Sequence, residues 1–335
     1  MSVKVLFIGG TGIISSACSA RAVEMGLDLF LLNRGSTSSR PAPDGATILR
    51  GDIRDPVSAR SALEGHTFDT VVNWIAFTTD HVETDLELFR GRAGQYVFIS
   101  SASAYQTPPA HLPVTESTVL HNPFWKYSRD KIACEERLVQ AYRDENFPIT
   151  IVRPSHTYDK TLLPMEGGYT VIERMRQNKP VVVHGDGSSL WTLTHHRDFA
   201  KGFVGLLGSH GAVGEAFHIT SDEVVTWDQI HHIFADAAGV PPPQIVHVPS
   251  DVIAAYDPSW GAGLLGDKAH SMIFDNTKIK RFVPDFAATV PLSWGAREIM
   301  AWYDADPARR KANAEFDRLS DTLIAAQRRA NARDD

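Results

Sequence analysis

The stretch Val3-Lys4-Val5-Leu6-Phe7-Ile8-Gly9-Gly10-Thr11-Gly12-Ile13-Ile14-Ser15 joins an apolar run of strand length to a glycine-rich turn. Small and apolar residues follow at helical spacing: Ala17, Ala20, Ala22 and Val23. Glycines in such a turn allow close backbone approach, and the start of the helix offers unpaired N–H groups to a phosphate. The stretch therefore predicts a strand–turn–helix unit that binds the pyrophosphate of a dinucleotide. The alternative is an ordinary strand-to-helix turn.

The first half of the chain alternates strand and helix patterns, which is typical of an α/β protein with a doubly wound parallel sheet. The runs with strand character are Val3–Ile8, Leu29–Asn33, Ala46–Leu49, Thr70–Trp74, Gln95–Ser100 and Ile149–Arg153. Helical patterns lie between them, and the clearest spans Pro123–Tyr142. Proline suits the first turn of a helix, because its missing N–H group is not needed there.

Tyr127 and Lys131 lie four residues apart in that predicted helix, so both side chains face the same side. A free phenol has a pKa of about 10. A cation about 4 Å away stabilises the phenolate by roughly 4 kcal/mol at an effective dielectric of about 20. The spacing therefore predicts that Lys131 lowers the pKa of Tyr127 toward neutrality. The alternative is a surface helix that carries both residues without a joint role.

Hydroxyl groups follow the predicted strand Gln95–Ser100, in the segment Ser101-Ala102-Ser103. The carboxyl ends of strands are where open α/β sheets bind ligands. One of these hydroxyls is therefore expected to bond the substrate oxygen that Tyr127 protonates or deprotonates.

These three motifs, in this order, resemble the extended short-chain dehydrogenase/reductase superfamily, in particular its NAD(P)-dependent sugar epimerase/dehydratase branch. The resemblance runs from Val3 to about Tyr303. It implies a Rossmann fold with a smaller, discontinuous substrate-binding lobe. It also implies an NAD(P)-dependent enzyme that acts on a sugar-like alcohol or ketone, with nucleotide sugars among the candidate substrates.

The resemblance also implies roles for individual residues. The expected catalytic residues are Ser101, Tyr127 and Lys131, and Ser103 is the reserve for the hydroxyl. The cofactor is expected to contact Tyr127 and Lys131 and a further set consisting of Gly9, Gly12, Ile13, Ile14, Asn33, Arg34, Asp52, Ile53 and Pro154. Ser15 stands where the family usually has a third glycine, and its small side chain is expected to permit close helix packing.

The end of the second predicted strand bears on the choice of cofactor. A carboxylate there accepts hydrogen bonds from the ribose diol and repels a 2′-phosphate, whereas this chain has Asn33 followed by Arg34. A guanidinium binds phosphate well, so the sequence favours NADP over NAD. Two alternatives stay open: Arg34 points into solvent, or Asp52, which matches an adenine-contacting position of the family, only caps a turn.

Ala102 and Ser103 occupy the positions at which dehydratases of the family have an Asp-Glu pair. Eliminating water needs that additional acid and base. The sequence therefore disfavours a dehydratase. It leaves open an epimerase, which oxidises, rotates and re-reduces its substrate, and a simple reductase or dehydrogenase, which needs the same residues.

Ser103, His156 and Trp191 are the expected substrate contacts. Trp191 stands where sugar-nucleotide epimerases commonly place a diphosphate-binding arginine. An indole cannot neutralise phosphate but stacks on a sugar or base face, which weakens the nucleotide-sugar assignment. His156 is expected to bond substrate or to titrate in the pocket. The alternatives are a core role for Trp191 and a structural role for His156.

The alternation loosens after Arg153-Pro154, and glycine and proline become frequent. Helical spacing returns from Phe316 to Ala326. The expected divisions are a Rossmann domain at 1–155 with 180–210 returning to it, a substrate lobe at 156–179 and 211–303, and a C-terminal helix with a frayed end at 304–335.

The composition is typical of a globular enzyme. Of 335 residues, 43% are hydrophobic and 22% are charged, and the net charge of −7 argues against a nucleic-acid surface. No apolar segment approaches the length of a membrane span, and no signal-peptide pattern is present, so the expected location is the cytoplasm. Cys18 and Cys134 indicate neither a disulfide framework nor a metal site, and the histidines lack metal-ligand spacing.

Three hypotheses follow. The leading one is the enzyme, expected as a homodimer because the superfamily often packs the helix Pro123–Tyr142 against its twin; internal packing of that helix is the alternative. The second is a nicotinamide-dependent regulatory protein without turnover. The third is an RNA-binding relative of the chloroplast type, which shares the Asn33-Arg34-Gly35 stretch.

Overall fold

A computed structural model describes residues 2–35 and 40–332 of the chain. Seven parallel strands form the main sheet in the order β11-β6-β5-β4-β1-β2-β3. Their bounds are β1 Lys4–Ile8, β2 Asp28–Asn33, β3 Thr47–Arg50, β4 Phe68–Asn73, β5 Ala93–Ile99, β6 Ile149–Pro154 and β11 Ala216–Ile219. The predicted α/β doubly wound sheet is confirmed, and β1 to β6 begin and end within two residues of the predicted runs.

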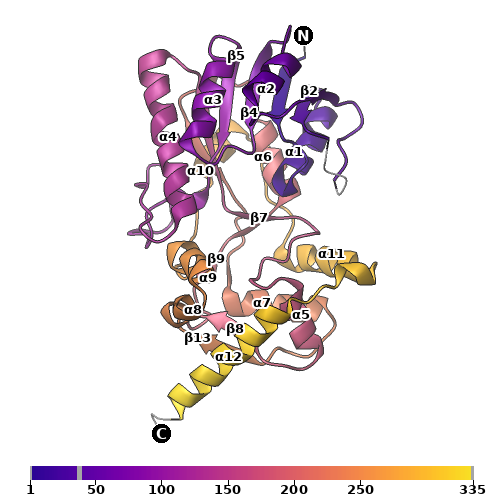
Figure 1. Ribbon diagram of the computed structural model, residues 1–335, viewed down its shortest axis with the longest axis vertical. Coiled ribbons are helices and arrows are strands. Elements are labelled where there is room, and N and C mark those ends of the chain that lie inside the picture. Colours follow the sequence, from indigo (N-terminus) through magenta and orange to yellow (C-terminus); the bar gives the residue numbers. More distant parts are fainter. Residues whose placement is uncertain (1, 36–39, 333–335) are drawn as a thin grey trace.

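Helices cover both faces of this sheet in the upper part of the molecule (Figure 1). Val5 and Phe7 of β1 pack on one side with α1 and α6, whereas Leu6 and Ile8 pack on the other side with α2, α3 and α4. Burial on both faces explains why β1 is apolar throughout rather than alternating. The bounds of these helices are α1 Ile13–Glu24, α2 Pro56–Ala62, α3 Thr79–Phe89, α4 Lys126–Glu145 and α6 His196–Val204.

A smaller lobe lies below the sheet in Figure 1 and has its own apolar core. Its short strand pairs are β8 Val181–His184 with β13 Ile245–Val248, and β9 Leu190–Trp191 with β12 Val225–Thr226; β7 His156–Tyr158 pairs with β10 Leu193–His195. The remaining elements are η1 Ala102–Ala104, α5 Tyr169–Arg176, η2 His210–Ala212, α7 Trp227–Ala237, α8 Ser250–Tyr256, α9 Pro258–Gly263, η3 Leu264–Lys268, α10 Thr277–Phe282, α11 Leu292–Asp304, η4 Pro307–Arg309 and α12 Ala314–Asn331.

The pairing of β8 and β11 differs from the predicted division of the chain. Strand β8 pairs with β13 of the smaller lobe, although residues 180–210 were expected to return to the Rossmann domain; within that range, α6 does pack on the main sheet. Strand β11 extends the main sheet beside β6, although 211–303 was assigned to the substrate lobe. Both strands are only four residues long and mostly apolar, and such short sequences do not specify which sheet edge they join.

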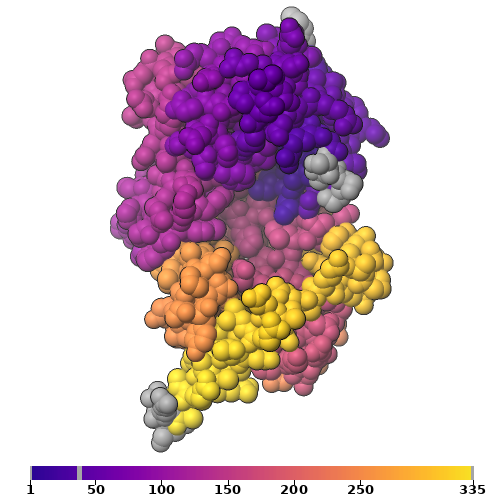
Figure 2. All heavy atoms as spheres, in the orientation of Figure 1, coloured from indigo at the N-terminus to yellow at the C-terminus, as the bar shows by residue number. Residues whose placement is uncertain are grey.

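The C-terminal helix α12 crosses the smaller lobe and buries Leu323 and Ile324 against it (Figure 1). The frayed end predicted beyond it falls on residues 333–335, outside the described part of the chain. No helix within 2–35 and 40–332 is both long and apolar enough to cross a bilayer. Figure 2 shows the surface hollowed between the indigo-to-magenta upper part and the yellow and orange lower part.

Candidate active site

The turn between β1 and α1 brings bare backbone to the carboxyl edge of the sheet. Gly9 and Gly10 have φ angles of +101° and +96°, which side chains rarely adopt. A Cβ atom on Gly10 would lie 2.7 Å from Leu31 Cδ2. These positions therefore need glycine, and the turn lies between β1 and β4, where the chain reverses its order across the sheet.

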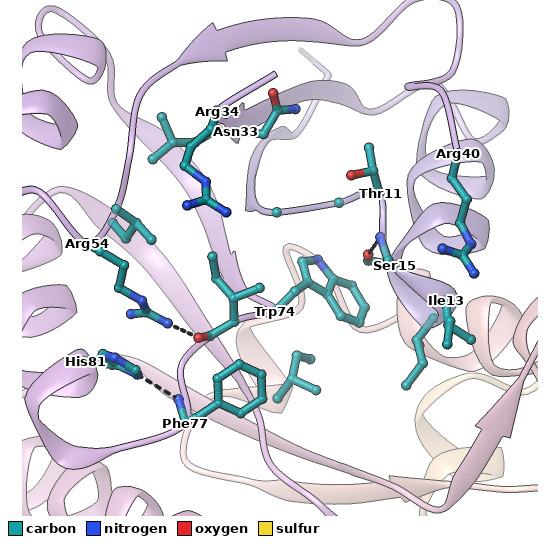
Figure 3. A pocket seen from close by; sticks show the side chains of 18 of the residues that line it. Thr11, Ile13, Ser15, Asn33, Arg34, Arg40, Arg54, Trp74, Phe77 and His81 are labelled. Atoms are coloured by element: carbon teal, nitrogen blue, oxygen red, sulfur yellow. Dashed lines mark hydrogen bonds between the residues drawn. The ribbon is translucent and has the colours of Figure 1, made fainter. Parts of the chain in front are cut away.

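Ser15 closes the first turn of α1. Its Oγ accepts a hydrogen bond from Gly12 N at 2.8 Å, drawn as a dashed line in Figure 3. The residue is buried, which agrees with the predicted close packing around a small side chain. Ser15 thus replaces the expected third glycine and satisfies one N–H group at the start of the helix.

A cavity of about 1040 Å³ extends from this turn along the carboxyl ends of β1, β2 and β4. Every residue predicted to bind the cofactor lines it: Gly9, Gly12, Ile13, Ile14, Asn33, Arg34, Asp52, Ile53, Tyr127, Lys131 and Pro154. Figure 3 shows Arg34 and Arg54 on one side of the cavity and Arg40 on the other. The described lining is therefore rich in positive charge, which suits the phosphates of a dinucleotide.

The end of β2 has the features on which the cofactor prediction depended. Asn33 Oδ1 accepts a hydrogen bond from Gly35 N at 3.0 Å, so its side chain supports the turn. The Arg34 side chain is 69% exposed and its Nη1 lies 3.9 Å from Asp52 Oδ2. Asp52 also accepts from Arg54 N at 2.9 Å, which is the turn-capping role considered as its alternative. The guanidinium of Arg34 remains accessible from the cavity.

Arg40 and Arg54 were not among the predicted site residues. Arg54 Nη2 donates to the carbonyl oxygen of Ile75, as drawn in Figure 3. Arg40 Nε donates to Asp159 Oδ2 at 2.7 Å, and its Nη2 donates to Thr161 Oγ1. The only sequence signal for Arg54 is its place two residues after Asp52, and Arg40 has none, because its partners lie more than a hundred positions away in the sequence.

The predicted catalytic residues come together at one end of this cavity, where Ser101, Tyr127 and Lys131 all line it. A chain of hydroxyls leads to the site: Ser128 Oγ donates to Ser103 Oγ at 2.8 Å, and Ser103 Oγ lies 2.9 Å from Ser101 Oγ. Either hydroxyl can donate in the contact between Ser103 and Ser101. Ser103 is buried in this relay, so it supports Ser101 as well as lining the space beyond.

The prediction that Lys131 lowers the pKa of Tyr127 is wrong, because that pKa is raised. Burial raises the pKa of Tyr127, a hydrogen bond with Ser101 opposes that rise, and the charge of Asp267 adds to it. Lys131 Nζ donates to the carbonyl oxygens of Ala76 and Ile99 at 2.6 and 2.7 Å, and it lies 5.9 Å from the centre of the Tyr127 ring. The ammonium is thus held by two backbone carbonyl groups.

Lys131 itself is strongly affected by its surroundings. Burial lowers the pKa of its ammonium to about 8, because a charge is costly in an apolar environment. Its Nζ lies 4.6 Å from the centre of the Phe77 ring and 4.9 Å from that of Phe98. Such a lysine remains largely charged at neutral pH and is ready to donate to a ligand that enters the cavity.

A second cavity of about 600 Å³ opens between the main sheet and the smaller lobe and shares Ser101 and Tyr127 with the first. The predicted substrate residues Ser103, His156 and Trp191 line it. Trp191 Nε1 donates to His156 Nδ1 at 3.2 Å, and Trp191 packs against Trp227 with ring centres 5.5 Å apart. Trp191 is therefore a buried wall that orients His156, which fits its core alternative better than open stacking.

His156 is electrically neutral in this site. Burial lowers its pKa to about 3, with a smaller effect from the charge of Lys268. Because the indole N–H can only donate, Nδ1 of His156 is an acceptor, and the ring proton is on Nε2. His156 therefore offers a hydrogen-bond donor and does not titrate near neutral pH, whereas its contact with substrate stays a prediction.

Asp267 and Lys268 line the same cavity and were not predicted as site residues. Burial raises the pKa of Asp267 to about 6, and the charge of Lys268 acts against that rise. The two side chains are 3.9 Å apart. They belong to η3, a short π-helical segment of the smaller lobe, and no local sequence pattern connects them with Tyr127.

The sequence model of the NAD dependent epimerase/dehydratase family matches residues 5–220. The chloroplast stem-loop binding protein of 41 kDa b from Arabidopsis thaliana is 28% identical over 257 residues, which cover 73% of this chain. The chain spans 65% of the length of that protein.

Two further proteins are similar. The 2'-dehydrokanamycin reductase of Streptomyces kanamyceticus is 23% identical over 244 residues, covering 72% of this chain and 68% of that protein. The crystal structure of UDP-glucose 4-epimerase from Bifidobacterium longum, in complex with NAD+ and UDP, has a TM-score of 0.71 and 19% identity, covering 91% of this chain and 99% of that one. The structural likeness supports the same fold.

Proposed function

We propose that this chain, which belongs to the NAD dependent epimerase/dehydratase family, is an NAD(P)-dependent oxidoreductase or epimerase that acts on a sugar-like alcohol or ketone. The observation that carries this proposal is the meeting of two cavities at Tyr127 and Ser101. One cavity has the glycine turn and the arginines that suit a dinucleotide. The other brings a second molecule against the same phenol.

The residues of the first cavity fit a dinucleotide. Its pyrophosphate would lie against the backbone of Gly9 to Gly12, where the positive φ angles of Gly9 and Gly10 favour glycine, and its adenosine would lie near Asp52 and Ile53. When bound, the nicotinamide supplies or accepts hydride. Lys131 would donate to the cofactor's ribose from its position between two backbone carbonyls.

Tyr127 would exchange a proton with the substrate oxygen. In the oxidising direction the phenolate would accept the proton of the substrate hydroxyl, while the carbon that bears this hydroxyl would lose hydride to the oxidised cofactor. In the reducing direction the phenol would return a proton to the carbonyl oxygen, while the carbonyl carbon would gain hydride from the reduced cofactor. Ser101, which is hydrogen-bonded to Ser103 and through it to Ser128, would hold the substrate oxygen and stabilise the phenolate. Since burial raises the pKa of Tyr127, the active phenolate needs the added positive charge that a bound oxidised nicotinamide brings.

The reaction is proposed to be epimerisation or reduction rather than dehydration. The segment after Ser101 forms the short helix η1 with Ala102 and Ser103, and neither side chain supplies the acid and base that elimination needs. Relatives by sequence include reductases and UDP-glucose 4-epimerases, in keeping with both remaining reactions.

Replacing Tyr127 with Phe tests the proposal. Turnover should fall by about 100-fold or more, because the proton-exchanging group is lost. The dissociation constant of the cofactor should stay within about threefold, since the glycine turn and arginines remain. Tyr142→Phe on the exposed face of the same helix is the matched control. Equal turnover in both variants, measured by nicotinamide absorbance, would contradict a role for Tyr127.

We also propose that NADP is preferred over NAD, because Arg34 presents an accessible guanidinium where a carboxylate would select NAD. Arg34→Ala should weaken NADP binding about tenfold and leave NAD binding nearly unchanged, because only NADP has the 2′-phosphate. Isothermal titration with both cofactors measures this. Arg60→Ala, which removes an exposed ion pair with Glu87, is the control. A parallel loss of affinity for both cofactors would exclude this basis for selectivity.

The similarity to a chloroplast stem-loop binding protein favours one alternative, a nicotinamide-dependent regulatory or RNA-binding protein without turnover. Hydride transfer that depends on Tyr127 would exclude it. Tight RNA binding that weakens steeply with salt, without any turnover, would support it instead. Assembly as a cytoplasmic homodimer is part of the leading proposal, and light scattering of the purified protein measures the oligomeric state.

A further inference from the structure

Asp267 lies close to the proposed reaction centre because Asn122 joins the two. The amide of Asn122 donates to Ser103 O at 2.9 Å and to Gly266 O at 2.6 Å. Its Oδ1 accepts from Trp125 N at 3.0 Å, just before the helix of Tyr127 begins. Asn122 is buried, so the segment that carries Asp267 is fixed to both the serine and the tyrosine side of the site.

The backbone at Asp267 is specialised for this approach. Ala269 N donates to Leu264 O at 2.9 Å, a five-residue spacing that defines a π-turn, and such turns are frequent at functional sites. A Cβ atom on Gly266 would lie 2.7 Å from Trp125 Cβ, and the Trp125 and Tyr127 rings are 5.0 Å apart. The carboxylate follows directly after this close contact.

The charge of Asp267 is poorly compensated. Among the described residues its one ion-pair contact is Lys268 Nζ at 3.9 Å, beyond hydrogen-bond distance. The positive charge of Lys268 also acts on Glu166, a second carboxylate at the exposed mouth of the cavity. The other ionisable lining groups are Tyr127 and neutral His156, and no arginine lines the described part of this cavity. Negative charge therefore exceeds positive charge on the substrate side.

This excess of negative charge opposes the proposed proton transfer unless a positive charge on the substrate cancels it. The charge of Asp267 raises the pKa of Tyr127, so it opposes formation of the phenolate. A hydroxyl of the substrate would bond the carboxylate but leave its charge in place. A diphosphate would add negative charge beside it. An ammonium group would cancel the charge and so favour both binding and the phenolate.

We propose that Asp267 is a specificity-determining residue that binds an ammonium group of the substrate, so that the protein acts on an amine-bearing, unphosphorylated sugar-like alcohol or ketone. This inference rests on the proposed function, since it names the substrate class of the same site. The neutral His156, oriented by Trp191, donates to a hydroxyl or carbonyl of that substrate. The apolar wall formed by Leu163, Met165 and Phe274 covers its carbon faces.

The first test measures binding to the NADP-loaded protein by isothermal titration. The probes are glucosamine and kanamycin, their N-acetylated forms, which lack the charge, and UDP-glucose. At least one amine should bind about tenfold tighter than its acetylated form and tighter than UDP-glucose. Tighter binding of UDP-glucose, or no preference for either amine, would overturn the inference.

The second test uses Asp267→Asn, which keeps the shape and removes the charge. The preference for the amine over its acetylated form should fall about tenfold. Asp236→Asn, on the exposed face of α7, is the matched control and should keep the preference. An unchanged preference in Asp267→Asn would overturn the inference.

A pH profile separates this role from a structural one. With an uncharged alcohol from a general panel, the acidic limb of kcat/KM should shift to lower pH in Asp267→Asn, because the charge that opposes the phenolate is gone. An unmoved limb would contradict the coupling. Hydride transfer that is lost in Tyr127→Phe, yet prefers UDP-glucose, would refute this inference and leave the proposed function intact; no hydride transfer with any substrate would refute the proposed function.

Discussion

Asp85 is a buried carboxyl group behind the proposed cofactor site. Its Oδ2 accepts hydrogen bonds at 2.5 Å from both Tyr96 Oη and Asn73 Nδ2, whereas its Oδ1 is buried without a partner among the described residues. Burial raises the pKa of Asp85 to about 7, and the bonds from Tyr96 and Asn73 and the charge of Arg54 act against that rise. The folded protein therefore holds a proton on Asp85 that the unfolded chain releases near pH 3.8.

The direction of the pH effect follows from this shift. The stabilising contribution of Asp85 is fully present below about pH 3.8 and is lost as the pH rises through about 7, where the folded protein must bury the charge. Asp85→Asn removes the charge and keeps an oxygen acceptor. We expect its free energy of unfolding at pH 8 to exceed that of the unaltered protein by about 1–3 kcal/mol.

Urea unfolding at pH 8 and pH 5 measures that effect. The difference between Asp85→Asn and the unaltered protein should shrink at pH 5, where Asp85 is already protonated. Asp144→Asn, at an exposed position of α4, is the control and should show little difference at either pH. A stability gain that is the same at both pH values would contradict the assignment of the buried charge.

Among the elements, the loop between β2 and β3 is joined through Arg40 to the segment that follows β7. Arg40 belongs to this loop and binds Asp159 and Thr161, which follow β7. Asp159 is buried and also accepts from Thr161 N at 2.8 Å, so the acceptor is fixed before Arg40 arrives. Arg40 also lines the cavity proposed for the dinucleotide, so the ion pair with Asp159 holds one of the lining side chains in place.

Breaking this connection should speed the release of NADP. We expect Arg40→Ala and Asp159→Asn each to raise the dissociation rate several-fold, on the order of 1 kcal/mol for a partly buried charge pair. The double variant should add little, because both changes remove one interaction. Stopped-flow fluorescence of bound NADPH gives the rates. If Arg40→Ala raises the dissociation rate and Asp159→Asn does not, Arg40 acts by direct contact with the cofactor and its bond to Asp159 does not affect release.

In the whole molecule, the site exists because two parts of the chain meet at the carboxyl edge of the sheet. The turn, Ser101 and Tyr127 come from the main sheet and its helices, and His156, Trp191 and Asp267 come from the segments beyond β6. Figure 2 shows this meeting place as the hollow between the two parts. Ligand sites are common at such boundaries, where one part of the chain can line a cofactor cavity and the other can line a substrate cavity.

The sequence predicted much of this arrangement and missed identifiable parts of it. The strands β1 to β6 and the turn at Gly9 were predicted because apolar runs and glycines influence the conformation of the few residues around them. The placement of β8 and β11 was wrong, because strand character does not specify a partner. Arg40 and Asp267 were missed because each lies in a segment with no pattern of its own.

The α/β sheet, the glycine turn after β1 and the shared helical face of Tyr127 and Lys131 could be predicted from the sequence, because each depends on neighbours along the chain. The direction in which the pKa of Tyr127 shifts follows only from the folded structure, since it depends on burial and on the charge of Asp267, 140 positions away. The folded structure also decided that Lys131 is held by the carbonyls of Ala76 and Ile99. Desolvation and Coulomb interactions depend on distance in space, and the folded chain alone sets those distances.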